Sequence, residues 1–491
     1  MQKLSSLFFT IAIAGLAVVT PAKAQSHMTA PAFSEEECHV SGVMSAVRCY
    51  SLVRPLYSGS SDTTILRGII VPSDAIVPES DPLIILTGGP GQAASDMVPM
   101  MHNLFRAVLN TRDLIFFDIR GTGLSDSVSC IYPDDDFELL GQLDLGLVTE
   151  QLQRCFRDHG DKLQDATTKM AVADIDALRR ALGVEQVNLW GVSYGSRLAQ
   201  YYINEHETRV RSAILDGVVP FAPSYINQTP TYALQALNKM TQDCAANAGC
   251  AAAFPAFDPL LLMDQIAEEQ EITYFHPVSN DRVTVTINRD SVAQVIFTAL
   301  YSPQSRAFIP YVLTQAITHD NWGPLAVLAD DPNRYFGIQT IYAGARFSII
   351  CSEEQTNLNS ASDGSNAFQS GATLKALFST ACDQWPMKNE PLPSPKVGAF
   401  SVPTILISGA LDPITPPDLA EHSLKYFQNA QHIILKNGAH FNSHVPCIRD
   451  YLVYFIEASE TSDIELDCIG DGYMPAFITG GARQAVGHNK Q

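Results

Sequence analysis

Residues 187–203 read VNLWGVSYGSRLAQYYI, and their pattern is the strongest indication of the fold. A short apolar run leads into a G-x-S-x-G motif at residues 191–195, and a segment with helical spacing follows it. A tight turn between strand and helix needs glycine on both flanks, because larger side chains would clash there, and it exposes the serine hydroxyl. We therefore expect Ser193 to be a nucleophile, with the backbone N–H of Tyr194 as an oxyanion donor. A chance match at a structural turn is the competing interpretation.

Three more short apolar runs, at residues 82–87, 114–118 and 213–216, have the same character as the run before Ser193. Short, fully apolar strands are typical of parallel sheets that are buried on both faces. Residues 168–182 have apolar positions at helical spacing and end before Gly183, a suitable C-cap. Strand, helix and strand joined by right-handed crossovers predict a doubly wound, mostly parallel sheet.

The pattern changes after the fourth run. Residues 221–398 are rich in Ala, Leu and Gln, with candidate helices at 234–240, 260–269 and 291–300, a hairpin at 271–287 and a Ser/Asn/Gly-rich mobile loop at 357–371. Apolar runs at 404–408 and 432–435 then restore the strand pattern. We expect a core at 25–220 and 399–470, interrupted by a mainly helical cap at 221–398, and a tail at 471–491 without assigned structure.

A serine nucleophile needs a base, and the base needs an orienting acid. Asp412 follows the run at 404–408, and His440 follows the run at 432–435, each on a glycine-containing loop. Open α/β sheets place their ligands at the carboxyl ends of the strands, and the chain order Ser, Asp, His suits this kind of site. We therefore expect Ser193, Asp412 and His440 to form a catalytic triad. His422, His432 and His444 lack this context and are interpreted as structural or solvated.

Two glycine-rich turns follow the first two apolar runs. In TGGPG, residues 87–91, the backbone amide of Gly89 is the candidate for a second oxyanion donor, with a plain turn as the alternative. The turn DIRGTGLS, residues 118–125, has neither a Walker lysine nor the G-x-G-x-x-G spacing of a phosphate-binding loop. We therefore interpret Arg120 as a structural clamp between neighbouring loops.

The N-terminus has the features of a bacterial-type secretory signal peptide. Lys3 precedes an apolar run at residues 7–19, and AKA at residues 22–24 matches a cleavage site. The run is too short to span a bilayer, so we expect cleavage after Ala24, export to the periplasm or the medium, and no stable membrane anchor. The formal charge of −21 argues against binding to nucleic acid or to anionic lipid and suits solubility.

The ten cysteines form an even set, which in an exported chain predicts disulfides. Sequence alone leaves their connectivity open. Our hypothesis is pairing between nearest neighbours, namely Cys38 with Cys49, Cys130 with Cys155, Cys244 with Cys250, Cys351 with Cys382, and Cys447 with Cys468. The chain has no C-x-x-C pair and no H-E-x-x-H motif, so we expect neither a metal nor a cofactor.

Six motifs occur in an order that resembles the proline iminopeptidase and tripeptidyl aminopeptidase group of α/β-hydrolases. They are TGGPG, DIRGTGLS, GVSYGS, RSAILDGVVP, GALDPITPP and NGAHF, and the resemblance spans about residues 60–220 and 398–455. It implies the α/β-hydrolase fold and cleavage near the free N-terminus of a peptide. Ser193, Asp412 and His440 match the positions of that group's catalytic triad. The group usually has His before G-G-P-G, where this chain has Thr87, so local hydrogen bonding should differ.

The resemblance also implies acidic groups in the cap region that hold the substrate's α-ammonium. Glu353 and Glu354, after the apolar segment at residues 347–350, are the candidates, since carboxylates suit an ammonium ion. A solvated acidic turn is the alternative.

Three functions stay open at this point. The first is an aminopeptidase that acts on short peptides through an acyl-enzyme at Ser193. The second is an esterase or another hydrolase of small esters and amides on the same scaffold, because one fold hosts many substrates. The third, a non-catalytic binding protein, is disfavoured by the intact Ser, Asp and His set. Sequence gives neither the residue preferred at the cleavage site nor the oligomeric state.

Overall fold

The computed structural model describes residues 32–130, 145–221, 226–266, 269–275, 280–330, 341–358, 369–390, 392–461 and 475–480. The predicted signal peptide, residues 359–368 of the predicted mobile loop, and most of the predicted tail lie outside these ranges. Among the described helices, none has both the length and the apolar content that crossing a bilayer requires.

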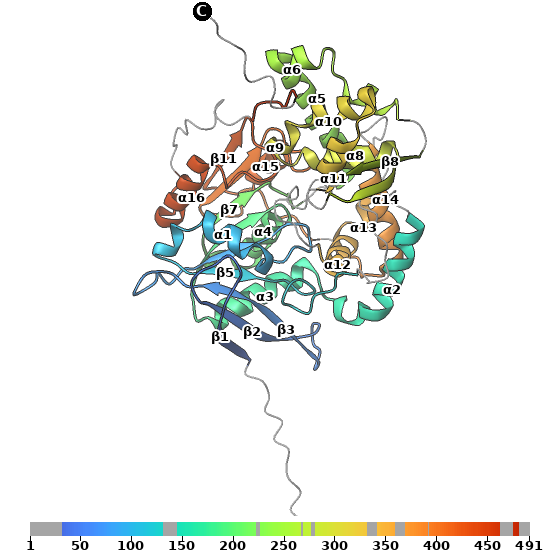
Figure 1. The fold of residues 1–491 in the computed structure, drawn as a ribbon. Helices are drawn as coiled ribbons and strands as arrows, with labels where there is room; N and C mark the ends of the chain where they lie inside the picture. Colours follow the sequence, from blue (N-terminus) through green and yellow to red (C-terminus); the bar gives the residue numbers. More distant parts are fainter. Residues whose placement is uncertain are drawn as a thin grey trace, which may run out of the picture. The chain divides into compact units, whose positions relative to one another are not determined.

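A nine-stranded, mostly parallel sheet forms the centre of the fold (Figure 1). Its strand order is β1-β2-β3-β5-β4-β6-β7-β10-β11. The strands are β1 (Phe33–Cys38), β2 (Val47–Pro55), β3 (Thr63–Val71), β4 (Leu83–Leu86), β5 (Leu114–Phe117), β6 (Val187–Val192), β7 (Val210–Asp216), β10 (Thr404–Gly409) and β11 (Ala430–Leu435). From β5 onward neighbouring strands pair in parallel, which confirms the predicted sheet, whereas β1, β2 and β3 pair antiparallel and were not predicted.

The central strands β4, β5, β6 and β10 are buried on both faces, which explains their unbroken apolar runs. In β4, Ile84 and Leu86 pack into the cluster that includes helices α3 (Thr168–Ala181) and α4 (Tyr194–His206). Leu83 and Ile85 point the other way, into the cluster with α1 (Val98–Leu104) and α16 (Pro446–Ala458). Because successive side chains of a strand face opposite sides, a strand covered on both sides needs apolar residues throughout.

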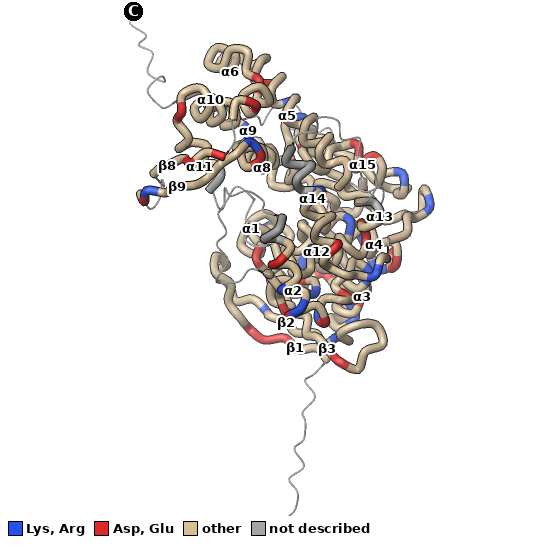
Figure 2. The backbone as a smooth tube through the Cα atoms, turned by 90° about the vertical axis from the view of Figure 1, so that its right-hand side faces the viewer, with Lys and Arg blue, Asp and Glu red and all other residues tan. Residues whose placement is uncertain are grey.

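The outermost strand β1 carries three consecutive glutamates, Glu35 to Glu37, which mark its edge in red in Figure 2. An edge strand exposes unpaired backbone groups that attract other strands, and charged side chains discourage such pairing. The glutamates of β1 therefore protect this edge of the sheet against pairing with other strands.

The segment between β7 and β10 is mainly helical and adds no strand to the large sheet in the part that the structure describes. Helices α5 (Thr229–Ala246) and α8 (Arg289–Ala299) confirm two predicted helices, and β8 (Gln270–Phe275) pairs with β9 (Arg282–Ile287) as the predicted hairpin. The helix predicted at 260–269 is shorter: α7 spans Pro259–Met263, and the chain enters β8 soon after it.

This segment divides into two packing groups. The cluster that contains α5, α8 and α10 (Ile309–His319) draws its buried residues almost entirely from residues 233–328. Helices α12 (Ala343–Glu353) and α14 (Gln369–Gln384) instead share a cluster with α2 (Leu145–Leu163) of the first part of the chain. The second group thus brings the end of α12 next to elements of the core.

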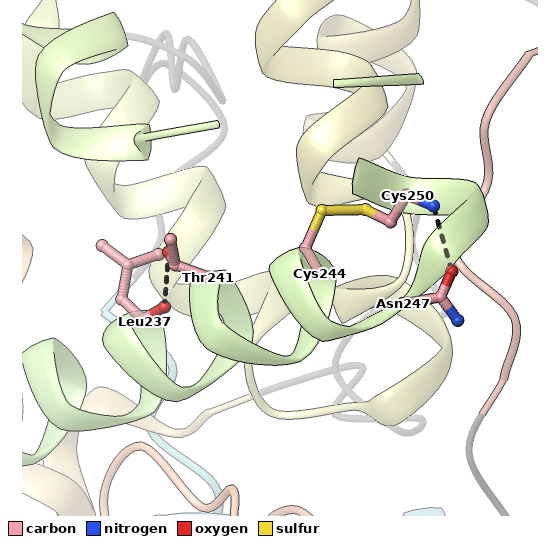
Figure 3. Close-up of a disulfide and its surroundings, with 5 residues drawn as sticks. All are labelled: Leu237, Thr241, Cys244, Asn247 and Cys250. Atoms are coloured by element: carbon pink, nitrogen blue, oxygen red, sulfur yellow. Dashed lines mark hydrogen bonds between the residues drawn. A yellow bond between two sulfur atoms is a disulfide. The ribbon is translucent and has the colours of Figure 1, made fainter. Parts of the chain in front are cut away.

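Four of the predicted disulfides are present, joining Cys38 to Cys49, Cys130 to Cys155, Cys244 to Cys250, and Cys351 to Cys382. Figure 3 shows the pair from α5 and α6 (Ala248–Ala253), where the side chain of Asn247 accepts the N–H of Cys250 and caps α6. Cys447 is disulfide-bonded, and its predicted partner Cys468 lies outside the described residues.

Candidate active site

Ser193 occupies the turn between β6 and α4 in a strained backbone conformation, with φ 55° and ψ −125°. A residue other than glycine rarely has positive φ, and such strain is typical of functional sites. A Cβ on Gly191 would lie 2.4 Å from the carbonyl oxygen of Gly195, and a Cβ on Gly195 would lie 2.1 Å from that of Leu86. The flanking glycines are therefore required by close packing, as expected, and Ser193 itself stays partly exposed.

Asp412 and His440 are hydrogen-bonded to each other on the loops after β10 and β11. The distance from His440 Nδ1 to Asp412 Oδ2 is 2.9 Å. Asp412 Oδ1 accepts the N–H groups of Ile414 and Thr415, both at 2.9 Å. With Nδ1 donating to the carboxylate, the neutral imidazole leaves Nε2 as the acceptor, which is the form that a general base needs.

Charge and burial act in opposite directions on this pair. Burial alone would raise the pKa of Asp412, but the charge of His440 and the hydrogen bonds from His440 and Thr415 hold it below its usual range. Burial alone would lower the pKa of His440, but the Asp412 carboxylate, and less strongly Asp216, raise it. The pair therefore stabilises the positive charge that His440 acquires when it takes a proton.

Thr415 bridges the acid and the base. Its hydroxyl donates to Asp412 Oδ2 at 2.6 Å and lies 3.0 Å from His440 Nδ1. We expect Thr415→Val to reduce kcat by about 10- to 100-fold, because it removes a hydrogen bond to a buried carboxylate at the point where the imidazole is held. Thr415→Ser, which keeps the hydroxyl, should retain most of the activity. Steady-state kinetics on any hydrolysed ester would check both, and equal losses in the two variants would contradict this role.

Ser193 and His440 both contact one short segment, Asp216-Gly217, at the end of β7. The N–H of Ser193 donates to the carbonyl oxygen of Asp216 at 2.9 Å. A Cβ on Gly217 would lie 2.7 Å from the carbonyl oxygen of His440 and 3.4 Å from its Cε1. Since β6, β7, β10 and β11 are neighbours in the sheet, Ser193, Asp412 and His440 gather at their carboxyl ends.

The glycine loop after β4 lies against Ser193. A Cβ on Gly88 would approach the Cβ of Ser193 to 3.0 Å. Thr87 Oγ1 donates to the carbonyl oxygen of Gln92 at 2.9 Å, and Gln92 Oε1 accepts the N–H of Gly88 at 3.1 Å. Thr87 thus closes the loop through its own hydroxyl. Gly89, with φ 108°, has a conformation that favours glycine, and its role as an oxyanion donor beside Tyr194 stays a prediction.

Glu353 and Glu354 are both buried, so the alternative of a solvated acidic turn is wrong. Glu354 forms an ion pair with Arg197 on α4, with 2.6 Å between Oε1 and Nη1. Glu353 Oε1 accepts the N–H of Thr168 at 3.2 Å. Burial raises the pKa of Glu353 to about 7, against the opposing effects of Arg197 and Thr168.

Two contacts connect the acidic pair to the nucleophile turn. Thr168 Oγ1 lies 2.8 Å from the hydroxyl of Tyr194, the residue after Ser193. Arg197, the partner of Glu354, lies one turn after Ser193 on α4. The end of α12 is therefore packed against the start of the nucleophile helix.

Arg120 is confirmed as a structural clamp. Its Nε and Nη2 donate to the two carboxylate oxygens of Asp174 at 2.6 and 3.0 Å, and its Nη1 donates to the carbonyl oxygens of Pro55 and Leu56. The three histidines outside the site have contacts of their own: His432 with Glu421 and Ser408, His444 with Phe441, and His422 with Lys425.

Besides Thr415, sequence reasoning missed two residues that act on the candidate base, Tyr301 and Asp216. Tyr301, after α8, places its ring 5.0 Å from the ring of His440, and its carbonyl oxygen accepts the N–H of His440 at 3.3 Å. No local signal singles out this tyrosine, because the contact joins distant parts of the chain. Asp216 did carry a signal, since it ends a buried apolar run and precedes a glycine.

Comparison with known proteins agrees with this architecture. Residues 81–445 match the family model described as alpha/beta hydrolase fold. The chain is 27% identical over 430 residues to serine protease Hip1 of Mycobacterium tuberculosis, covering 79% of this chain and 80% of the relative. It is 24% identical over 417 residues to tripeptidyl aminopeptidase of Streptomyces lividans, covering 79% and 76%. Proline iminopeptidase of Neisseria gonorrhoeae matches at 26% over 175 residues, covering 36% and 44%. These matches confirm the resemblance that the motifs carry.

Proposed function

The chain belongs to the α/β-hydrolase family, and from this membership we propose that it is a serine aminopeptidase that releases residues or short peptides from peptide N-termini. The observation that carries the proposal is the hydrogen-bonded Asp412–His440 pair beside the strained turn of Ser193. The relatives named as a tripeptidyl aminopeptidase and a proline iminopeptidase support the peptide substrate class.

The reaction proceeds through an acyl-enzyme. Ser193 Oγ attacks the scissile carbonyl while His440 Nε2 takes its proton, and the backbone N–H groups of Gly89 and Tyr194 stabilise the oxyanion. His440 then returns the proton to the departing amine, and water hydrolyses the ester in a second, equivalent cycle. Asp412 holds the imidazole in the required tautomer throughout.

The acidic pair supplies the charge for the substrate's α-ammonium. When both carboxylates are ionised, Arg197 neutralises one of them, and the remaining negative charge belongs to Glu353. A buried charge without a full counter-ion is costly, so an ammonium ion that compensates it binds favourably. Glu353, rather than Glu354, is therefore the main recognition residue in this proposal.

Export to the periplasm or the medium is the second part of the proposal. The four described disulfides suit an oxidising compartment, and the N-terminal pattern of residues 1–24 suits a cleaved signal peptide. Mass spectrometry of the N-terminal peptide of the exported protein should show that the mature chain begins at Gln25, as glutamine or as its cyclised pyroglutamate.

Glu353→Gln is expected to raise KM for substrates with a free α-amine by about 10-fold or more, because the amide carries no charge for the ammonium. The same change should leave KM for acetylated or simple ester substrates nearly unchanged. In the wild type, KM for free-amine substrates should rise as the pH falls through about 7, since Glu353 then becomes protonated. In Glu353→Gln this dependence should disappear. An equal loss on all substrates would instead indicate a purely structural carboxylate.

A panel of chromogenic substrates tests the proposed function as a whole. It contains amides of single amino acids, a dipeptide and a tripeptide, each with a free and an acetylated N-terminus, beside matching simple esters. Cleavage of the free-amine peptides that is lost on acetylation supports the aminopeptidase, and the preferred length separates removal of one residue from removal of three. Activity on esters alone, indifferent to the amine, would favour a small-molecule esterase and remove the role of Glu353.

A further inference from the structure

Asp216 is a fully buried carboxylate that the reaction above does not use. Its Oδ2 accepts the N–H of Ser443 at 2.7 Å, the hydroxyl of Ser443 at 2.7 Å and the N–H of Asn442 at 3.0 Å. Its Oδ1 accepts the side-chain amide of Asn442 at 3.3 Å. These two partners lie two and three residues after His440, so Asp216 holds the loop that carries the base.

The direction of these hydrogen bonds shows which form of Asp216 the site is built for. The indole N–H of Trp190, which can only donate, donates to Ser443 Oγ at 3.0 Å. The hydroxyl proton of Ser443 must therefore be directed at Asp216. With backbone N–H groups and an amide as the remaining partners, the carboxyl is surrounded by donors, and this arrangement fits the anion. Burial raises the pKa of Asp216, and the hydrogen bonds from Ser443 and Asn442 oppose that rise.

The same residue also contacts the nucleophile turn. Its backbone carbonyl oxygen accepts the N–H of Ser193 at 2.9 Å. One residue at the end of β7 therefore binds the nucleophile turn through its main chain and the base loop through its side chain. If the nucleophile turn or the base loop shifts, the distance and orientation between Ser193 and His440 change. Catalysis is sensitive to such misplacement on the scale of an ångström.

Among the described residues, the charged and titratable groups around His440 come from several elements. Asp412 from the loop after β10 is hydrogen-bonded to it, and Tyr301 from the segment after α8 packs its ring against it. Asp216 acts on both His440 and His444 through its charge. His440 thus has two buried carboxylates on its side of the site, one in direct contact and one behind its loop.

We propose that Asp216 is a positioning residue, which fixes the base loop against the nucleophile turn and adds a second negative charge that favours the protonated form of His440. This inference rests on the proposed function, because it assigns His440 as the base. It differs from the role of Asp412 because, in the described contacts, Asp216 accepts backbone N–H groups after His440 whereas Asp412 is hydrogen-bonded to the imidazole ring.

Asp216→Asn tests both parts of this role. The variant puts an amide NH₂ among donors and removes the charge, so kcat/KM should fall about 10- to 100-fold. The acidic limb of the pH–rate profile, which reports His440, should move to lower pH by about half a unit or more. A residue that only helped the chain fold would lower activity without moving the limb. The profile is measured on a simple ester, so that it does not depend on recognition of the α-amine.

Two further variants keep the test decisive. Asn442→Ala retains the charge of Asp216 but removes the side-chain hydrogen bonds from Asn442 to Asp216 and to the carbonyl oxygen of Ala439, so it should lower kcat several-fold and leave the limb in place. This variant decides the positioning role if Asp216→Asn does not fold. Ser212→Ala is the matched control, since Ser212 is buried on the same strand and bonded only to Asn188 through its hydroxyl in the described contacts, so both limb and kcat should be unchanged.

The outcomes separate this inference from the function beneath it. Suppose that the wild type is active. The role of Asp216 is then overturned if folded Asp216→Asn leaves the acidic limb unmoved or if Asn442→Ala keeps full activity, and the assignment as a hydrolase stands in either case. A wild type that neither hydrolyses any panel substrate nor reacts with a fluorophosphonate overturns the proposed function, and this inference with it.

Discussion

Ser193→Ala should lower kcat by roughly 10⁴-fold or more, the loss expected when a triad nucleophile is removed. The variant lacks the oxygen that forms the acyl-enzyme, while the oxyanion loop and the substrate contacts remain. KM should change little, because alanine fits the space that the serine occupies. The measurement is steady-state hydrolysis of the best substrate in the panel, with circular dichroism to show that the fold is retained.

The control for this variant is Ser61→Ala, an exposed serine between β2 and β3, which should be fully active. A folded Ser193→Ala protein with wild-type turnover would mean that the strained turn has another use and that the triad assignment is wrong.

Asp412→Asn should lower kcat by roughly 10³- to 10⁴-fold, as expected when the orienting acid of a triad is made neutral. Asp412 Oδ1 is held by the N–H groups of Ile414 and Thr415, so the oxygen of the asparagine takes that position and its NH₂ faces His440 Nδ1. The imidazole must then carry its proton on Nε2, where it cannot accept the proton of Ser193.

Raising the pH should restore little of the kcat lost in Asp412→Asn. If the substitution only changed the pKa of His440, deprotonation at high pH would recover activity, but the wrong tautomer is present at every pH at which His440 is neutral. Asp418→Asn is the matched control, an exposed carboxylate in the first turn of α15 (Pro417–Leu424), and it should be fully active. Full activity in Asp412→Asn would contradict the orienting role of Asp412, and Asp216, whose charge also acts on His440, would be the next carboxylate to test.

Sequence predicted the parts of the fold whose residues are constrained on every side. β4 and β5 are buried on both faces, so their apolar runs stand out, and the glycines around Ser193 are demanded by contacts shorter than 2.5 Å. The antiparallel strands β1 to β3 were missed because β1 is mostly exposed and because β2 and β3 mix buried and partly buried residues, so neither a continuous apolar run nor a clean alternation marks them.

The candidate site could be predicted where a residue follows an apolar strand: Asp412 follows the buried β10, and His440 follows the partly buried β11. It was not predictable where a contact joins distant segments. The bond from Arg197 to Glu354 and the ring contact of Tyr301 with His440 depend on how the helical segment packs on the core. Asp216 is an intermediate case. The sequence placed it at the end of an apolar strand, but its role depends on a contact with the loop after His440, which the sequence did not predict.

Mass spectrometry of the protein after reaction with a fluorophosphonate probe shows directly whether Ser193 is an activated nucleophile. We expect one adduct, on the peptide that contains Ser193, which forms on the native protein but neither on protein denatured before labelling nor on Ser193→Ala. An adduct on another residue, or no adduct in a protein that hydrolyses its substrate, would contradict this assignment.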